Sequence, residues 1–437
     1  MTSLSHLVAR SVVVNGPIDP IGLSGEDGWL LAGRDCVIAA VGLAATIELP
    51  DGLQGAGEAA VSRCLSSIMH FDTAGIGPAG LRAFGSLPFS PTAPAQLTVP
   101  ALIVQRRSDG TWVATSIASH DTMPLVSTDD GELSDEAEAP KVRSAVAMPT
   151  PSGYEEAVQA ATKQMELGEL QKVVLGRRLT VTLDRPLAVT PAIRRLAARE
   201  PLCTVYAVPT SRGRFFGASP ELIVTKQGTT FHSRPLAGSV AIDGSDADAA
   251  REQAFEASVK NQHEHELVVV DMLDRLRSVT TSVEAESQPS LVILRSIAHL
   301  GTEITGTTEP WPTGPDALEL AAAIAPTPAV GGVPFELAVT AIAELEGFDR
   351  GEWAGLVGSV DAAGDGTFVL GIRGATTKGS TLVLHAGCGI VAESDPAEEL
   401  EETTFKLRAV LDVLLPGASD QLFAALSGRT TDPNLGA

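Results

Sequence analysis

The stretch over residues 387–406 places the strongest constraint on this chain, because a glycine pair separates a predicted strand from an acidic predicted helix. The apolar run over residues 381–384 predicts a buried strand, and the Gly-x-Gly beginning at Gly387 predicts a turn. Asp395 suits the N-cap of the helix, since its carboxylate can accept hydrogen bonds from free amides of the first turn. Pro396 suits that first turn, where the amide hydrogen that it lacks would have no partner.

Three charged residues share one face of this predicted helix. Glu399, Glu402 and Lys406 are three and four residues apart, a spacing that brings side chains together on an α-helix. A glycine turn beside such a face could hold a carboxylate substrate next to a divalent cation. The alternative is an acidic helix surface in water, which is the more frequent situation for charged side chains.

The charge balance excludes several partners. The 437 residues carry 31 Lys and Arg against 54 Asp and Glu, a formal net charge of −23. Such a chain repels phosphate backbones, so we expect no nucleic-acid partner. We find no apolar run long enough to cross a membrane and expect no membrane partner. A small anionic substrate would need local positive charge or a metal, which makes basic residues within motifs informative.

The four cysteines argue for a reducing compartment. Cys36, Cys64, Cys203 and Cys388 are scattered and form no C-x-x-C pair. A disulfide framework or a thiolate zinc site is therefore not expected. Residues 1–16 lack the basic region and cleavage site of a signal peptide, so we predict a cytoplasmic protein.

Composition divides the chain into four segments. Residues 1–118 alternate short apolar runs with Gly and Pro, which predicts strands with one or two helices. Residues 119–152 are acidic and aperiodic, which favours a linker or surface loop. Residues 153–415 contain the motifs described below, and residues 416–437 are expected to form a C-terminal helix and tail. His70 and Asp72 lie close together in the first segment, but a lone pair of this kind is more often structural.

An amphipathic helix and a strand open the third segment. Ser152 and Glu155 fit a capping box, and apolar residues then recur at helical spacing from Tyr154 to Met165. The β-branched run that begins at Lys172 predicts a strand. Lys172 either reaches solvent at the strand end or points into a pocket. In a pocket, desolvation would lower its pKa and make it a usable base.

Two further charged residues lie among apolar neighbours. Glu221 follows a tight turn in a predicted strand pair over residues 203–225, where it is either a surface glutamate or a buried acid of raised pKa. Arg373 lies in a predicted strand over residues 367–375. A buried arginine needs an anion, and a substrate carboxylate would serve. Residues 233–239 predict a loop.

A segment rich in histidine and glutamate occurs within a long predicted helix over residues 246–277. Zinc-binding H-E-x-x-H motifs need two histidines one helical turn apart. Here His263 and His265 are two residues apart and lie on different faces, and Leu267 stands where the second histidine is required. We reject a zinc site of that kind and retain Glu264 as a candidate inward carboxylate.

Ordered motifs connect these segments: KVVLGR, GASPEL, SRPLAGS, HEHELV, PTPAVGG, FDRGEWAGLVGSVD, AGCGIV and EELEETTFKL follow one another over residues 153–412. This set resembles the chorismate-utilising enzymes, and most closely the isochorismate synthases of siderophore and menaquinone pathways. The resemblance implies an α/β (α+β) fold of two large, mostly antiparallel sheets packed together with surrounding helices. Residues 1–118 would then belong to the same unit.

Single positions separate the branches of this family. Lys172 stands where anthranilate synthases have glutamine, and Ala237 stands where aminodeoxychorismate synthases have lysine. No lysine follows Pro334, unlike in anthranilate and salicylate synthases. These features favour an isochorismate synthase. Two positions depart from its pattern, Ala325 in place of histidine and Trp353 in place of Tyr or Phe, and both concern the pocket's shape rather than the reaction class.

The resemblance also implies residue roles. Lys172 would be the general base and Glu221 the general acid in a reaction that adds water at C2 of chorismate and releases the C4 hydroxyl. A Mg²⁺ cofactor would be held by Glu264, Glu399 and Glu402. Chorismate itself would be bound by Gly238, Ser239, His299, Arg373, Gly387 and Lys406.

Two alternative functions stay open at this point. A salicylate synthase would use the same base, acid and metal, and would then eliminate pyruvate from isochorismate. A catalytically inactive paralogue would bind chorismate or a pathway partner, although retention of Lys172, Glu221 and the three glutamates argues against it. We expect a monomer with a small-molecule substrate.

Overall fold

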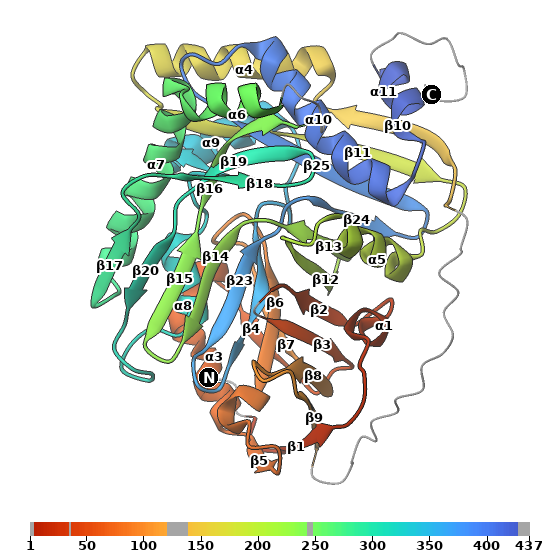
Figure 1. Ribbon diagram of the computed structural model, residues 1–437, viewed down its shortest axis with the longest axis vertical. Coiled ribbons are helices and arrows are strands. Elements are labelled where there is room, and N and C mark those ends of the chain that lie inside the picture. The colour runs from red at the N-terminus through yellow and green to blue at the C-terminus, as the bar shows by residue number, and fades with distance from the viewer. Residues whose placement is uncertain (1–3, 35, 120–138, 243–247, 427–437) are drawn as a thin grey trace.

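Two large sheets form the framework of the computed structural model, which describes residues 4–34, 36–119, 139–242 and 248–426 (Figure 1). In this described part, neighbouring strands pair antiparallel except for the parallel pair of β1 (Leu7–Val14) and β5 (Met69–Asp72). The expected fold of two mostly antiparallel sheets with surrounding helices is confirmed.

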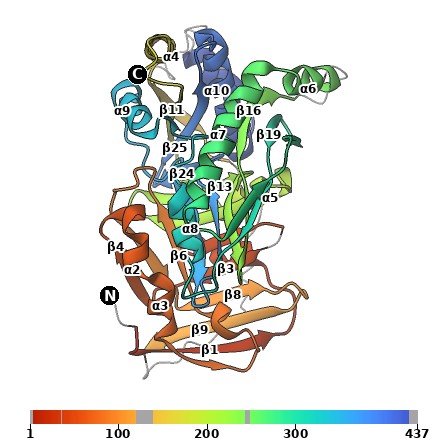
Figure 2. The ribbon, with the colours of Figure 1, turned by 90° about the vertical axis from the view of Figure 1, so that its left-hand side faces the viewer.

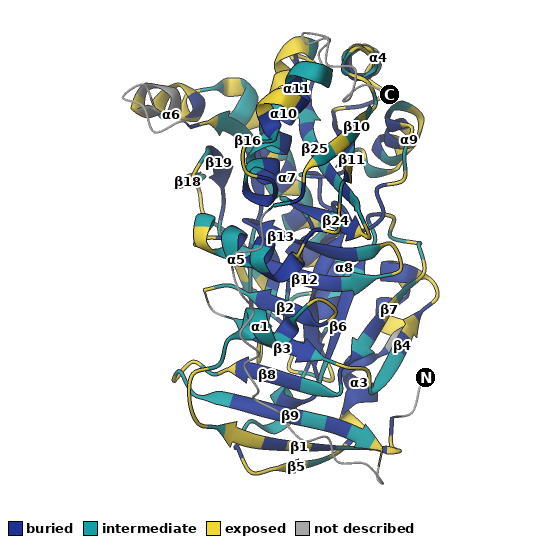
Figure 3. Ribbon diagram, turned by 90° about the vertical axis from the view of Figure 1, so that its right-hand side faces the viewer, coloured by how far each residue is buried: buried dark blue, intermediate teal, exposed yellow. Residues whose placement is uncertain are grey.

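The larger sheet runs along the long axis of the molecule (Figure 3). Within the described residues it has 13 strands, with the short β21 (Gly332–Val333) paired to β11 off the main path. The order along that path is β10 (Val142–Met148), β11 (Lys172–Leu183), β25 (Thr381–Ile390), β24 (Gly374–Lys378), β13 (Gly213–Ser219), β12 (Thr204–Thr210), β2 (Trp29–Ala32), β3 (Val37–Val41), β8 (Leu102–Arg106), β9 (Trp112–Ser119), β1 and β5.

The second sheet packs against the first, and a small third sheet lies in the upper half of the molecule as drawn in Figure 1. Strands from residues 1–118 complete both large sheets, since β2 pairs with β12, and β6 (Arg82–Leu87) pairs with β22 (Leu356–Asp361). The second sheet has the order β17 (Ser282–Ala285), β20 (Ile304–Thr307), β15 (Thr230–Arg234), β14 (Leu222–Gln227), β23 (Gly366–Leu370), β22 (Leu356–Asp361), β6 (Arg82–Leu87), β7 (Ala95–Val99) and β4 (Ala45–Leu49). The third is β16 (Leu236–Ala241), β19 (Ile297–Gly301) and β18 (Ser290–Ile293).

Helices cover the outer faces of this framework (Figure 2). Those that matter most for the site are α7 (Val259–Arg277), beside the third sheet, and α10 (Pro396–Leu414), across β25. The other described helical elements are α1 (Pro20–Ser24), η1 (Gly52–Gly55), α2 (Ala56–Ala59), α3 (Val61–Ser66), η2 (Gly77–Gly80), α4 (Pro151–Glu166), α5 (Val189–Arg199), α6 (Asp248–Glu256), α8 (Ala317–Ile324), α9 (Phe335–Glu346) and α11 (Ser419–Leu426).

The hydrophobic core lies between the sheets and beneath the helices (Figure 3). This position explains why some strands are apolar on both faces. Strand β11 is buried on both faces over its first half, because α4, α9 and α10 all contact it. A strand covered on both sides is a continuous apolar run rather than an alternating one. The predicted inner face of α4, from Tyr154 to Met165, is buried as expected.

Two predicted helix starts are corrected. The N-cap of α4 is Thr150, whose hydroxyl accepts a hydrogen bond from the Gly153 amide at 3.2 Å, so the expected capping box at Ser152 is wrong. Pro151 occupies the first helical position, where its missing amide hydrogen has no partner. The expected long helix over residues 246–277 is two helices, because Ser258 caps a new one, α7.

Four predictions of strands, turns and loops are also corrected. Gly387 and Gly389 lie inside β25, not in a turn. The expected strand over residues 367–375 is divided between the two large sheets, with β23 in the second and β24 in the first. Similarly, the expected strand pair over residues 203–225 is β12, β13 and part of β14, and much of the expected loop over residues 233–239 is strand. Local patterns do not reveal where a chain changes sheet.

The acidic segment over residues 119–152 is only partly described. Residues 120–138, which hold the acidic cluster, lie outside the described residues. Val142–Met148 forms the edge strand β10, and α4 begins at Pro151, so the end of the expected loop is regular structure. The predicted C-terminal helix corresponds to α11, and residues 427–437 are not described.

Candidate active site

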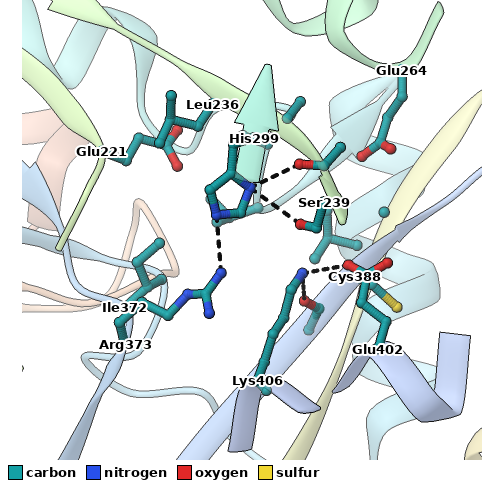
Figure 4. Close-up of a pocket in the computed structure, with 18 of the residues that line it drawn as sticks. Glu221, Leu236, Ser239, Glu264, His299, Ile372, Arg373, Cys388, Glu402 and Lys406 are labelled. Carbon is teal, nitrogen blue, oxygen red and sulfur yellow. Dashed lines mark hydrogen bonds and ion pairs between the residues drawn. The ribbon is translucent and has the colours of Figure 1, made fainter. Parts of the chain in front are cut away.

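One pocket collects the predicted site residues (Figure 4). It has a volume of about 100 Å³ and lies where the third sheet, α7, α10 and β25 meet the crossover between the large sheets. All predicted residues except Lys172 line it: Glu221, Gly238, Ser239, Glu264, His299, Arg373, Gly387, Glu399, Glu402 and Lys406. These come from seven separate stretches of the chain, so tertiary packing creates the pocket.

The glycines of β25 keep part of the pocket open. A Cβ atom added at Gly389 would overlap the Glu264 carboxylate and lie 3.0 Å from Lys172 Cε. One added at Gly387 would lie 3.1 Å from the Trp353 ring. Glycine is therefore required here for close approach of side chains, not for a turn.

Lys172 lies behind this glycine wall. It is the first residue of β11 and its side chain is fully buried, which excludes a lysine that reaches solvent at the strand end. Its Nζ is 3.1 Å from Glu264 Oε1, although the ammonium is not aligned for a hydrogen bond with any described residue. The predicted base and one predicted metal ligand thus form a buried ion pair.

Glu221 is a buried acid rather than a surface glutamate. It lies between β13 and β14, and its Oε1 has no hydrogen-bond partner among the described residues. Burial raises the pKa of Glu221 to about 8, an effect that the Leu236 amide and the positive charges of Lys172, Arg373 and Lys406 only partly oppose. The carboxyl group is therefore largely protonated at neutral pH, as a general acid must be.

Arg373 and His299 form the next part of the wall (Figure 4). Arg373 lies at the crossover between sheets with φ 56°, and its Nη2 is 3.1 Å from His299 Nε2. Because guanidinium only donates, Nε2 accepts and Nδ1 carries the proton, which it donates to the Gly238 carbonyl at 2.8 Å. Burial, together with Arg373 and Lys406, holds the pKa of His299 well below its usual value.

The contact with His299 leaves the positive charge of Arg373 available to an anionic ligand. Burial lowers the pKa of Arg373, but a guanidinium remains protonated in proteins. Its partner His299 is neutral, so no opposite charge from that contact neutralises the guanidinium. An anionic ligand group would do so, in agreement with the expectation that a buried arginine needs an anion.

The acidic face of α10 points inward. Asp395 caps the helix and Pro396 is its first residue, as predicted. The Glu399 side chain is 3% exposed and bonded to Lys260 Nζ at 2.9 Å. Burial and the neighbouring Glu402 raise the pKa of Glu399. The alternative of a fully solvated acidic surface is therefore wrong for this face of the helix.

Lys406 closes the same face. Its Nζ lies 2.6 Å from Glu402 Oε1 and donates to the Gly387 carbonyl at 2.9 Å (Figure 4). The side chain is thus fixed between helix α10 and strand β25. The predicted spacing of Glu399, Glu402 and Lys406 on one face is confirmed.

The three predicted metal ligands are all carboxylates. No group of three or more His, Cys, Asp or Glu side chains in the described residues is already arranged to hold a metal ion. Glu264, Glu399 and Glu402 nevertheless line one pocket, and each is paired with a lysine. Oxygen donors of this kind suit Mg²⁺, which takes few protein ligands and completes its shell with water and substrate. The donor chemistry fits.

Sequence reasoning missed several residues of the pocket. Lys260 is one helical turn before Glu264, a spacing that could have revealed it. Trp353, noted only as a departure, lines the pocket and stacks on His385 with ring centroids 5.1 Å apart. Ala325 lies outside the lining. His70 lies on β5, at the edge of the larger sheet, and its ring forms a hydrogen bond with the Ser11 hydroxyl, which supports a structural role.

Known proteins are similar to this chain in sequence and in fold. The model of the family "Chorismate binding enzyme" matches residues 29–415. A Mycobacterium tuberculosis protein provisionally named isochorismate synthase MenF is 40% identical over 343 residues, 76% of this chain and 85% of that protein. Isochorismate synthase EntC of Escherichia coli is 33% identical over 331 residues, 75% of this chain and 80% of that protein. The solved structure of MenF, the menaquinone-specific isochorismate synthase from Escherichia coli, has a TM-score of 0.77 at 23% identity and 94% coverage of both chains.

The chain therefore belongs to the chorismate-binding enzyme family. Within that family, the relatives named above carry the name isochorismate synthase, as the sequence motifs predict. In the described part of the chain, no helix is both long and apolar enough to cross a membrane.

Proposed function

We propose that this protein is a Mg²⁺-dependent isochorismate synthase. The reaction adds water at C2 of chorismate while the C4 hydroxyl leaves and the double bond shifts, so one water enters and one departs. The observation that carries the proposal is Glu221, a buried acid with a pKa of about 8 in a pocket that also presents Arg373. The names of the relatives support the same reaction, and the product would feed siderophore or menaquinone biosynthesis.

Two proton transfers make the exchange of hydroxyl groups possible. Lys172 would act as the neutral amine, after its ammonium in the pair with Glu264 has lost a proton, and would take a proton from the water whose oxygen bonds to C2, since neutral water is a poor nucleophile. Glu221 would give its proton to the C4 hydroxyl, which then departs as water. Positioned proton transfer of this kind contributes roughly 10²–10⁴-fold each. The reaction is reversible, with Glu221 as the base and Lys172 as the acid.

The remaining pocket residues would bind and orient chorismate. Arg373 would pair with a carboxylate, because its own partner His299 is neutral. His299 is held by its hydrogen bond to the Gly238 carbonyl, which fixes the imidazole and keeps Nε2 toward Arg373. Lys406, held against Gly387, would add positive charge close to the acidic face of α10.

Mg²⁺ would be held by Glu264, Glu399 and Glu402, directly or through water. When bound, the ion supplies positive charge that offsets a substrate carboxylate and the electron density drawn toward it. In its absence the three carboxylates depend on nearby lysines for neutralisation.

The test is incubation of the pure protein with chorismate, with and without Mg²⁺, and chromatographic identification of products. Isochorismate that forms only with Mg²⁺, and stops at a mixture with chorismate, is the expected result. Salicylate with pyruvate would replace the proposal with a salicylate synthase. Unchanged chorismate would favour a protein that only binds its ligand.

A further inference from the structure

Lys260 is a pocket residue without a role in the mechanism above. It lies in the first turn of α7, two residues after the N-cap Ser258. Its Nζ donates to Glu399 Oε1 on α10 at 2.9 Å. The Lys260 side chain is 31% exposed, whereas that of Glu399 is 3% exposed, so the contact joins a side chain at the pocket mouth to a buried one.

The electrostatic surroundings of Lys260 coincide with the candidate metal site. Burial by itself lowers the pKa of Lys260, but Glu399, Glu264 and Glu402 outweigh it, and the pKa lies above its usual value. These are the three carboxylates that would hold Mg²⁺. A single ammonium therefore interacts with the whole cluster.

The other two lysines near the cluster are more firmly held. Lys172 is fully buried behind the pocket wall, and Lys406 donates to the Gly387 carbonyl as well as pairing with Glu402. Lys260 is the most exposed of the three, and its flexible four-carbon stem lets the ammonium turn toward water. If the Lys260 ammonium moves away from Glu399, water can solvate it, so its charge is not left buried without a partner.

We propose that Lys260 is the internal counter-cation of this carboxylate cluster, and that Mg²⁺ binding displaces its ammonium from Glu399 toward solvent. The inference rests on the proposed function, because it assumes that the cluster takes Mg²⁺. The ammonium and the metal compete for the same carboxylate oxygens and repel each other at short range. Lys260 therefore weakens Mg²⁺ binding, while it neutralises the buried carboxylates whenever the metal is absent.

The test is isothermal titration of Mg²⁺ into the wild type, Lys260→Gln, Lys260→Arg and Lys141→Gln, each in buffer and in a chorismate mixture already at equilibrium. Lys260→Gln removes the competing charge and is expected to bind Mg²⁺ at least about tenfold more tightly. Lys260→Arg keeps the charge and should bind no more tightly than the wild type. Lys141→Gln makes the same charge change beside Asp184, which follows the far end of β11, roughly 40 Å along the strand from Lys172. At that distance the change should have no effect on Mg²⁺ binding.

A second readout is thermal unfolding without chorismate. Mg²⁺ should raise the melting temperature of Lys260→Gln by more than it raises that of the wild type, since a ligand bound more tightly stabilises the fold more. Unchanged or weaker Mg²⁺ binding by Lys260→Gln, with a wild type that binds the metal, overturns the role of Lys260 alone. A wild type that binds no Mg²⁺ in either condition overturns the metal dependence in the proposed function. A Lys260→Gln protein that does not fold would be replaced by Lys260→Met, for which the same tightening is expected.

Discussion

Two buried ion pairs flank β11, and they differ in how fully their charges are satisfied. Glu346 and Arg350 form the first pair, in which Arg350 also donates to the Val330 and Val174 carbonyls at 2.7 Å each. The Gly176 amide donates to Glu346 at 2.6 Å. Every strong polar group in this pair thus has a partner.

The second pair, Lys172 and Glu264, has far fewer partners. Lys172 Nζ lies 3.1 Å from Glu264 Oε1, and the ammonium forms no hydrogen bond of good geometry with the described residues. We call a buried ion pair saturated when all of its polar groups have hydrogen-bond partners, and unsaturated when some do not. A saturated pair stabilises the fold, because loss of one member leaves the other charge buried without a partner. An unsaturated pair beside a pocket keeps its charges available to a ligand. Under the proposed function, the Glu346–Arg350 pair serves the stability of the fold and the Lys172–Glu264 pair serves the reaction.

The largest expected effect is on the unsaturated pair. Lys172→Ala should abolish turnover, a loss of roughly 10²–10⁴-fold or more, because the proposed base is removed. Mg²⁺-dependent chorismate binding should remain measurable by calorimetry. Lys163→Ala, an exposed change on α4, is the control and should be fully active. Near-normal turnover by Lys172→Ala would show that another group is the base.

Glu221→Gln tests the protonated acid. The amide cannot supply the proton, so turnover should fall by roughly 10²–10⁴-fold while chorismate affinity changes little. In the wild type, activity should decline as pH rises through about 8, since Glu221 then loses its proton. The folded-state pKa is raised, so wild-type stability should also fall as pH rises from the unfolded value toward 8. Denaturation at several pH values should show a flatter profile for Glu221→Gln, and identical profiles would contradict the assignment.

The saturated pair should matter for stability instead. Arg350→Met would leave Glu346 buried without its charge partner, and about 3–5 kcal/mol of unfolding free energy should be lost. Urea denaturation gives the value. The matched control is Arg212→Met, whose pairing with Asp349 is largely exposed and should cost under about 1 kcal/mol. Equal losses in both variants would remove the distinction drawn between the two kinds of pair.

The smallest expected effect comes from Gly389→Ala. The new methyl group would displace the Glu264 carboxylate and press on the Lys172 stem. Mg²⁺ affinity should weaken, by about tenfold if one carboxylate ligand is misplaced. Gly57→Ala is the control, since its added Cβ would meet Glu319 at an ordinary 3.4 Å. Calorimetric titration distinguishes the two, and unchanged affinity in Gly389→Ala would exclude Glu264 from the metal site.

The sequence by itself determined much of the local structure and most of the predicted residues that line the candidate pocket. The spacing of Glu399, Glu402 and Lys406 placed them on one face of α10, and Asp395 and Pro396 marked where that helix begins. These features depend on residues within one or two helical turns, which a periodic pattern can report. The ordered motifs identified the family, and through it seven further residues that line the pocket, although Lys260 and the pocket position of Trp353 were missed.

Only the tertiary structure decided which charges meet. Glu264 on α7 pairs with Lys172 on β11, and Lys260 on the same helix pairs with Glu399 on α10. Arg373 enters the pocket because the chain changes sheet at that point. Such contacts join residues far apart in the chain, and they depend on how the helices pack across β25. A local pattern states which face a residue occupies, whereas packing determines what that face contacts.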